Sequence, residues 1–294
     1  MTIYYVGIDG GGTSCRARIR DDQGTLIGEA KSGSANILLG VDVAMSSIVD
    51  AITQAAQQGQ LDSNHFSNIH IGLALAGAEQ KSAWFDFMAQ PHPFASMTLN
   101  TDAYGACIGA HNGQNGAIMI GGTGSCGIYL NNGEQHVVGG REFPISDQGG
   151  GAVMGLRLIQ QVLLAEDGIR SKTPLTQHVM NHFDNDVDAI VAWSKGAIPK
   201  DYGQFSPVIF QLANEGDELA IEMLKQTAAD IEMFVLALHR KGADKVCLMG
   251  SIAERILNWL SPPVQQWIVE PQFDAIEGAL MFAGKPQHNL YQQA

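Results

Sequence analysis

The segment GIDGGGTSCR at residues 7–16 joins an apolar run to a Thr-Ser pair through three consecutive glycines. Glycine-rich turns of this kind can hold phosphate through their backbone N–H groups. The dinucleotide fingerprint fails here because Cys15 takes the place of its last glycine, and the P-loop fails because Thr13 takes the place of its lysine. Residues 15–20 then alternate apolar side chains with arginines, which predicts a strand where both motifs need a helix. The turn is therefore predicted to join two strands as a β-hairpin.

A second turn of the same kind lies in IGGTGS at residues 120–125, where the GGT of residues 11–13 recurs. A lone glycine hairpin is usually only a tight turn, but two at equivalent places of a repeat predict a shared anion site. Backbone N–H groups and hydroxyls would then bind the phosphates, so no lysine is needed. The residues that we expect to bind them are Gly11, Gly12, Thr13, Ser14, Thr123, Gly124 and Ser125.

Two further features predict that the phosphates belong to ATP. In MGSIAE, residues 249–254, we expect Gly250 and Ser251 to let an adenine and its ribose lie against the backbone. Asp9 ends the first strand beside the glycines, where a carboxylate next to phosphate needs a cation between them. We therefore predict Mg²⁺ at Asp9, which binds through few carboxylates and keeps several waters. The alternative is that Asp9 caps the turn through its own backbone.

Three polar residues on loops at expected strand ends could form an acceptor site. Asp102 in LNTDAYGA lies between a strand and a helix, and Asp147 in ISDQGGGAVMG precedes three glycines and a helix. Either aspartate could instead be a helix cap, and Asn36 in SGSANILLG could be an ordinary turn residue. Phosphoryl transfer consists mostly of positioning, with a base oriented on the attacking hydroxyl. A carboxylate at one of these strand ends could be that base.

Hydrophobic periodicity predicts the elements that position these residues. In the first half we expect strands at 3–9, 15–20, 25–31, 69–76 and 97–101, with helices near 41–58, 79–90 and 103–112. In the second half we expect two strands within 117–130, strands at 134–139, 245–249 and 267–270, and helices near 150–165, 252–260 and 274–283. Both halves thus run βββαβαβα, which predicts two related lobes with a cleft between them. We place the lobes at 1–115 and 116–294, with a helical insertion at about 171–243, and allow the last helix to pack back on the first lobe.

Composition limits the partners and the location. The chain has 294 residues and a formal charge of −13, which argues against nucleic acid or an anionic membrane surface as a partner. Its four cysteines show neither a C-x-x-C pair nor zinc spacing. No signal peptide and no apolar run of membrane-spanning length are visible. We therefore expect a soluble cytoplasmic protein.

The order and spacing of GIDGGGTS, IGGTGS and MGSIAE resemble those of the actin, sugar-kinase and heat-shock-protein ATPase superfamily. Within it the chain resembles the BadF/BadG-type family and its N-acetylglucosamine kinase branch, most closely the bacterial glucosamine kinases, over residues 4–284. This resemblance implies an α/β fold of two ribonuclease-H-like lobes, as in actin-like ATPases. It also implies ATP-dependent phosphorylation of glucosamine at the 6-hydroxyl, in chitin and amino-sugar utilisation, by a homodimer.

The resemblance also assigns roles to the acceptor residues. It makes Asp102 the catalytic base, and it makes Asn36 and Asp147 ligands of sugar hydroxyls, with Gly149 keeping the loop close. N-acetylglucosamine kinases usually have Gly-Trp-Gly where this chain has Gly140-Arg141-Glu142. The missing indole argues against an acetyl pocket, and Glu142 could pair with a free ammonium at C2. The alternative is a solvated Glu142 paired with Arg141.

Three other functions stay open at this point. The chain could be an N-acetylglucosamine kinase. It could be an ATP-driven switch or filament protein, although 294 residues leave little room for partner-binding insertions. It could also be a BadF-type activator, which needs cysteine thiolates for an iron–sulfur cluster, and the scattered apolar cysteines do not resemble that arrangement.

Overall fold

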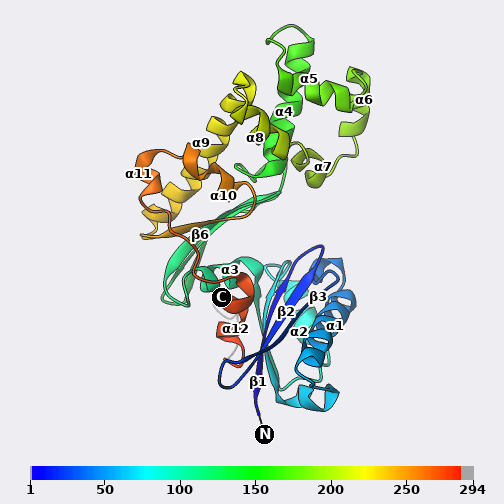
Figure 1. The fold of residues 1–294 in the computed structure, drawn as a ribbon, viewed down its shortest axis with the longest axis vertical. Coiled ribbons are helices and arrows are strands. Elements are labelled where there is room, and N and C mark those ends of the chain that lie inside the picture. Colours follow the sequence, from blue (N-terminus) through cyan, green and yellow to red (C-terminus); the bar gives the residue numbers. More distant parts are fainter. Residues whose placement is uncertain (1, 286–294) are drawn as a thin grey trace. The chain divides into compact units, whose positions relative to one another are not determined.

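The computed structural model describes residues 2–285, which fold into two compact units (Figure 1). Among these residues, unit 1 comprises 2–115 and 271–285, and unit 2 comprises Gly116–Glu270. The last helix, α12 (Ala275–Phe282), therefore belongs to unit 1, and the second unit ends at Glu270 instead of at residue 294.

Unit 1 contains a five-stranded sheet in the order β3-β2-β1-β4-β5. Strands β1 (Tyr4–Gly10), β2 (Cys15–Asp21) and β3 (Leu26–Ser32) are antiparallel, whereas β4 (Ile69–Leu75) and β5 (Ser96–Thr101) run parallel to β1. The helices are α1 (Val41–Gln58), α2 (Lys81–Met88), α3 (Asp102–Ala110) and α12, with short 3₁₀ turns at Ile37–Leu39 (η1) and Ser63–Asn68 (η2). This order is the predicted βββαβαβα.

Glycines in the strands of unit 1 let helices lie close to the sheet. A Cβ at Gly72 would come within 1.9 Å of the Ala279 carbonyl oxygen of α12, and a Cβ at Gly28 within 2.2 Å of the Ala55 carbonyl oxygen of α1. Ion pairs fix the start of α12, because the Arg18 guanidinium on β2 contacts Asp274 and Glu277 at 2.9 Å each. The last helix is thereby held on the sheet that begins the chain.

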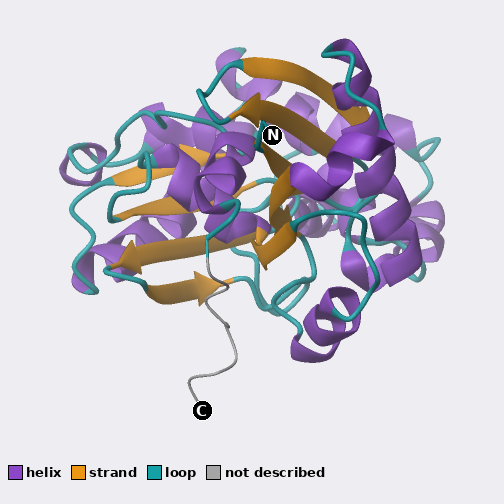
Figure 2. Cartoon of the chain, turned by 90° about the horizontal axis from the view of Figure 1, so that it is seen from below, coloured by secondary structure: helices purple, strands orange, loops and turns teal. Residues whose placement is uncertain are grey.

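Unit 2 contains a four-stranded sheet in the order β8-β7-β6-β9. In Figure 2, which is coloured by secondary structure, helices flank the strands. The strands of unit 2 are β6 (Gly116–Gly121), β7 (Ser125–Asn131), β8 (Glu134–Gly139) and β9 (Val246–Met249), and β9 is parallel to β6. Its helices are α4 (Gly151–Glu166), α5 (Pro174–His182), α6 (Val187–Ser194), α7 (Pro199–Gly203), α8 (Ser206–Asn214), α9 (Glu218–Arg240), α10 (Ala253–Ile256) and α11 (Pro262–Gln265).

Two predicted elements of unit 2 differ in the structure. The strand expected at 267–270 is a single bridge between Val246 and Ile268, so the order βββαβαβα is complete only in unit 1. Pro271, which cannot donate to a ladder, follows this short apolar run directly. The helix expected at 252–260 shortens to α10 and a 3₁₀ turn at Leu257–Trp259 (η3), ahead of two prolines.

The predicted helical insertion comprises α5 to α9, and α5, α6 and α9 each begin at a residue whose side chain caps the helix. The side chain of Asp217 accepts a hydrogen bond from the Ala220 N–H at the start of α9, and Gly216 with φ +91° separates α8 from α9. Leu238 of α9 is buried and packs near Gly127 of β7, so this long helix covers the sheet of unit 2. Within residues 2–285 no helix has both the length and the apolar character needed to cross a membrane.

Candidate active site

The first glycine turn follows β1 directly and is closed by a hydrogen bond from the Gly11 N–H to the Ser14 carbonyl oxygen, 3.0 Å. A Cβ at Gly11 or Gly12 would meet no atom within 4 Å, and neither backbone is left-handed. At Gly10, by contrast, a Cβ would come within 2.6 Å of the Leu75 side chain. Packing of the chain thus explains Gly10 but not Gly11 or Gly12. Open backbone at this place suits a bound phosphate, which needs close approach to N–H groups.

The second turn, between β6 and β7, has one glycine of the same open kind. A Cβ at Gly122 would meet nothing within 4 Å, whereas at Gly124 it would lie 2.6 Å from Asp147 Oδ2. The first N–H groups of α4 donate to this turn, Gly151 to the Gly122 carbonyl at 2.7 Å and Ala152 to the Thr123 carbonyl at 2.9 Å. Helix α4 therefore fixes the turn. Thr123 is exposed, as Thr13 is in the first turn, while Ser14 is half-buried.

Ser125 differs from Thr13 and Thr123, which are exposed, because its hydroxyl is buried and already hydrogen-bonded. Its side chain is buried and its hydroxyl donates to the Gln148 carbonyl oxygen at 2.7 Å. A hydroxyl has one proton, so this group cannot also donate to a phosphate while that bond persists. In this structure Ser125 joins the glycine turn to the following loop.

The third glycine segment lies against the second turn. Gly250 has φ +90°, and a Cβ there would be 2.7 Å from the Gly121 carbonyl oxygen, which accepts a hydrogen bond from the Ile252 N–H at 2.8 Å. Contact with the neighbouring turn therefore explains this glycine without an adenine. The Gly250 N–H donates to Glu254 Oε1 at 2.9 Å, and Ser251 is exposed.

Asp9 pairs with Arg16, which is not among the predicted site residues. Arg16 contacts Asp9 Oδ2 through one terminal nitrogen at 2.5 Å and through Nε at 3.2 Å. The antiparallel register places these residues opposite each other, so the hairpin itself contained the signal. The alternative for Asp9 is that its side chain caps the turn. Among residues 2–285, however, its carboxylate accepts no hydrogen bond from the turn backbone.

The residues around Asp9 fit Mg²⁺ only as a site completed by ligands from outside the chain. No group of three or more His, Cys, Asp or Glu side chains that could hold a metal occurs in the described part of the chain. Arg16 occupies Oδ2 and leaves Oδ1 without a partner among those residues. A single carboxylate oxygen, with waters and phosphate oxygens, is a usual environment for Mg²⁺.

Asp102 is the first residue of α3, but it does not cap the helix. The cap is Thr101, whose hydroxyl accepts a hydrogen bond from the Tyr104 N–H at 3.1 Å. Burial raises the pKa of Asp102, the nearby charges of Glu79 and Asp9 raise it further, and a hydrogen bond from the Ala103 N–H opposes the rise. A carboxylate with a raised pKa is a stronger proton acceptor, as a general base requires.

Asn36 caps the 3₁₀ turn η1 through Oδ1, which accepts from the Leu38 N–H at 2.9 Å. Its Nδ2 has no partner among the described residues, so this amide can donate to a ligand. The preceding residue, Ala35, donates its N–H to the Gly11 carbonyl at 3.1 Å. The loop that carries Asn36 is thus joined to the first glycine turn.

Asp147 and Glu142 lie in the loop between β8 and α4, and both have φ +69°. Burial raises the pKa of Asp147, a hydrogen bond from the Ser125 N–H opposes the rise, and the negative charge of Glu142 adds to it. No ion pair joins Arg141 to Glu142 within the described residues, contrary to the alternative considered above. Gly140 (φ +65°) and Gly149 (φ +82°) shape this loop, and Gly149 lies against Ile231 of α9. The loop therefore presents two carboxylates without a neutralising arginine.

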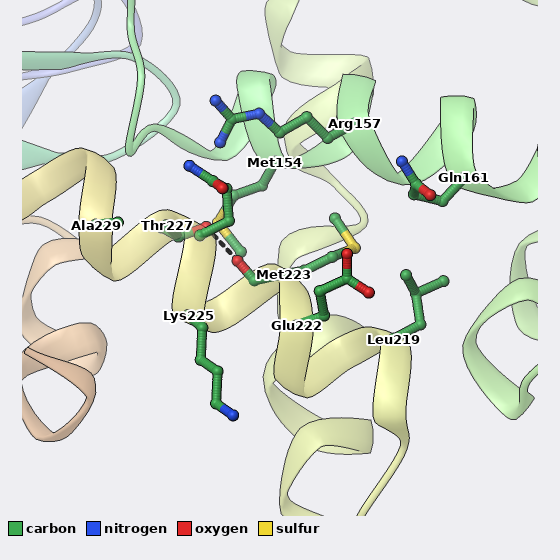
Figure 3. Close-up of a pocket in the computed structure, with 10 residues that line it drawn as sticks. Met154, Arg157, Gln161, Leu219, Glu222, Met223, Lys225, Thr227 and Ala229 are labelled. Carbon is green, nitrogen blue, oxygen red and sulfur yellow. Dashed lines mark hydrogen bonds between the residues drawn. The ribbon is translucent and has the colours of Figure 1, made fainter.

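A cavity of about 610 Å³ lies between α4 and α9 of unit 2, and Figure 3 shows its lining side chains. The Arg157 guanidinium at its rim pairs with the buried Asp230 carboxylate. The cavity contains none of the predicted site residues; its lining is Met154, Arg157, Gln161, Leu219, Glu222, Met223, Lys225, Gln226, Thr227 and Ala229. It is therefore separate from the glycine turns and the acceptor residues.

A family model described as the BadF/BadG/BcrA/BcrD ATPase family matches residues 6–283. The chain belongs to this family. Membership confirms the resemblance noted in the sequence and the prediction that ATP is used.

Known relatives agree with this assignment. The chain is 76% identical over 288 residues to "Glucosamine kinase GspK" of Vibrio cholerae, which covers 98% of each chain. It is similar to the crystal structure of a putative N-acetylglucosamine kinase from Chromobacterium violaceum, with 33% identity, a TM-score of 0.87 and coverage of 95% of this chain and 98% of that one. A glucokinase of the ROK family from Streptomyces griseus shares the fold at 14% identity and a TM-score of 0.55, over 95% and 99% of the two chains. The predicted α/β fold of actin-like ATPases is thereby confirmed.

Proposed function

We propose that this member of the family transfers the γ-phosphoryl group of ATP to the 6-hydroxyl of D-glucosamine, giving glucosamine 6-phosphate and ADP. The 76% identity to a protein named glucosamine kinase, over nearly the whole of both chains, is the observation on which this proposal mainly rests. The open glycine turns and the half-buried Asp102 carboxylate support it, because they supply the phosphate donors and the base that such a transfer needs.

For the nucleotide, we assign phosphate binding to open backbone at Gly11, Gly12 and Gly122 and to the exposed hydroxyls of Thr13 and Thr123. Asp9 would hold Mg²⁺ through Oδ1, and the ion would offset the charge of the phosphates. Arg16, which is paired with Asp9, supplies a further positive charge beside the turn. The other predicted nucleotide ligands are Ser14, Gly124, Gly250 and Ser251.

For the acceptor, Asp102 would take the proton of the 6-hydroxyl while the sugar oxygen bonds to the γ-phosphorus and the bond to the β-phosphate oxygen breaks. The raised pKa of Asp102 suits this role because the carboxylate holds the proton more strongly. Asn36 Nδ2 is available as a donor to one sugar hydroxyl, and the Asp147 carboxylate is available as an acceptor from another.

The loop between β8 and α4 favours glucosamine over its N-acetyl derivative. Glu142 and Asp147 are close enough for the charge of one to raise the pKa of the other, and no arginine neutralises Glu142 in the described residues. A C2 ammonium would relieve this repulsion through a charge-assisted hydrogen bond, whereas a neutral acetamide would not. We therefore assign substrate selection to this carboxylate pair, with Gly140, Arg141 and Gly149 shaping the loop around it.

A coupled ADP-release assay with glucosamine, N-acetylglucosamine and glucose in parallel tests the proposal. We expect the highest kcat/KM for glucosamine. Equal or higher kcat/KM for N-acetylglucosamine would establish the second candidate function, N-acetylglucosamine kinase, which the 33% identity to the putative Chromobacterium enzyme favours. No ADP release with any of the three would contradict a sugar kinase.

We also propose that the protein acts as a cytoplasmic homodimer in amino-sugar utilisation, including sugars from chitin. The family resemblance supports the dimer, and the substrates ATP and glucosamine support the cytoplasm as its location. Light scattering of the purified chain tests the dimer, since a monomer mass at micromolar concentration would contradict it.

A further inference from the structure

In each unit, one serine hydroxyl joins a glycine turn to the loop that carries an acceptor residue. In unit 1, Ser34 Oγ donates to the Gly11 carbonyl oxygen at 3.2 Å and accepts from the Asn36 N–H at 3.3 Å. A single hydroxyl therefore contacts the backbone of both the phosphate turn and the sugar-binding residue. The neighbouring hydrogen bond from the Ala35 N–H to the same carbonyl reinforces the connection.

Unit 2 contains a corresponding connection, but there the serine lies at the glycine turn and donates to the acceptor loop. Ser125 closes the glycine turn, and its Oγ donates to the Gln148 carbonyl oxygen of the acceptor loop at 2.7 Å. The Ser125 carbonyl oxygen also accepts from the Gly140 N–H of the same loop at 3.1 Å. The hydroxyl and the carbonyl oxygen of Ser125 thus both bond to the loop between β8 and α4.

These contacts have an energetic consequence. The turns have open space at Gly11, Gly12 and Gly122, so on the ligand side they are held by backbone hydrogen bonds, including those to the acceptor loops, and not by packed side chains. A ligand that orders the acceptor loop will also order the turn to which the loop is bonded, and the second ligand then has less ordering to do. By linkage the effect is reciprocal, so each ligand raises the affinity for the other by the same factor.

We infer that Ser34 and Ser125 are positioning residues that couple acceptor binding to nucleotide binding, one in each unit. This inference rests on the proposed function, because it takes the two loops to bind sugar and the two turns to bind phosphate. Neither serine needs to touch a ligand for this role. The coupling favours nucleotide binding when an acceptor is present, which limits loss of ATP to water.

The test measures the coupling factor directly. Calorimetry gives the Kd of a non-hydrolysable ATP analogue with Mg²⁺, first without sugar and then with a saturating amount of the sugar that the wild type phosphorylates. The coupling factor is the Kd without sugar divided by the Kd with sugar. We expect it to exceed one in the wild type. We expect Ser34→Ala and Ser125→Ala to lower it by about 2- to 10-fold, the contribution of one hydrogen bond. Ser34→Thr, which retains the hydroxyl, should restore most of it.

Two control variants remove comparable hydroxyls that contact no turn. Ser32 donates to the Ser47 carbonyl at 2.6 Å in unit 1, and Thr227 donates to the Met223 carbonyl at 2.9 Å in unit 2. Ser32→Ala and Thr227→Val should lower the free energy of unfolding in urea by a similar amount but leave the coupling factor unchanged. A merely structural role for Ser34 and Ser125 would make all four variants alike.

The outcomes separate this inference from the proposed function. A wild-type coupling factor of one, an unchanged factor in both alanine variants, or an equal loss in the controls would overturn the inference. None of these results depends on which sugar is the acceptor. If the wild type phosphorylates N-acetylglucosamine and not glucosamine, the proposed substrate is wrong, and the same measurement with N-acetylglucosamine still decides the role of the serines.

Discussion

Replacing Asp102 by asparagine separates a catalytic base from a structural residue, because the two roles predict opposite effects on stability. Asparagine is nearly isosteric, and its Oδ1 can still accept the Ala103 N–H that Asp102 accepts at 2.8 Å. The helix keeps its cap, since Thr101 provides it. The substitution therefore removes the ability to take a proton and little else.

We expect kcat for glucosamine to fall by about 10²- to 10⁴-fold, the usual contribution of general base catalysis. This corresponds to about 3 to 5 kcal/mol of transition-state stabilisation. The Kd for the ATP analogue should change little, because Asp102 is assigned to the acceptor. Single-turnover measurements and calorimetry on the same preparation give both numbers.

The same substitution should not destabilise the fold. Burial raises the pKa of Asp102 in the folded state, so the folded chain binds this proton more strongly than the unfolded chain does. Between the unfolded pKa of about 3.9 and the higher folded pKa, rising pH therefore costs the wild type stability that the asparagine variant keeps. Urea unfolding from pH 4 to pH 8 should show the variant gaining relative to the wild type. A less stable variant across this range, or a kcat within tenfold of the wild type, would refute the reasoning.

Three other substitutions test the remaining assignments. Gly12→Ala should weaken ATP binding at least tenfold and leave the free energy of unfolding in urea unchanged. Gly10→Ala should lower that free energy, because its Cβ would meet Leu75. Similar stability losses in both variants would contradict an open turn at Gly12. Asp9→Asn should weaken binding of MgATP but strengthen binding of ATP in EDTA, since it removes a negative charge and leaves Arg16 unpaired. If calorimetry shows that the Kd changes in the same direction with Mg²⁺ and with EDTA, Asp9 is not the metal ligand. Glu142→Gln should raise KM for glucosamine several-fold and leave KM for glucose unchanged, and steady-state kinetics that show no selective rise would exclude the ammonium contact.

The sequence predicts the fold of unit 1 well because strong local signals and tertiary packing agree there. The alternation of Cys15, Ala17 and Ile19 with arginines places β2 beside β1, and the buried core of both strands follows from it. The predicted strand at 267–270 fails because strand formation there depends on a partner edge, and the short run pairs only through Val246 and Ile268. The membership of α12 in unit 1 depends on contacts with β1 and β4 through Gly7 and Gly72, which no local pattern reports.

Site residues are predictable by type, but their partners are not. A glycine in a sequence gives no indication of why it is needed, and the structure separates open positions such as Gly122 from packed ones such as Gly250. Ser125 looks like a phosphate ligand by analogy with Ser14, and no sequence pattern reports that its hydroxyl is bonded to the Gln148 carbonyl oxygen. The pairing of Arg16 with Asp9 was available from the hairpin register, since the two residues are direct partners.

The distribution of charge explains how an acidic chain with a formal charge of −13 can serve a highly anionic substrate. Asp9 and Glu79 raise the pKa of Asp102, and Glu142 raises that of Asp147, so the negative charges near the assigned acceptor residues act on one another. These charges strengthen Asp102 as a base and attract an amino sugar, which enters as a cation. Transfer adds a phosphate group to that cation, so the same carboxylates then repel the product. Arg16 and the N–H groups of Gly12 and Thr13, which have no hydrogen-bond partner among the described residues, provide positive potential where the nucleotide phosphates are assigned, which separates the charge requirements of the two substrates.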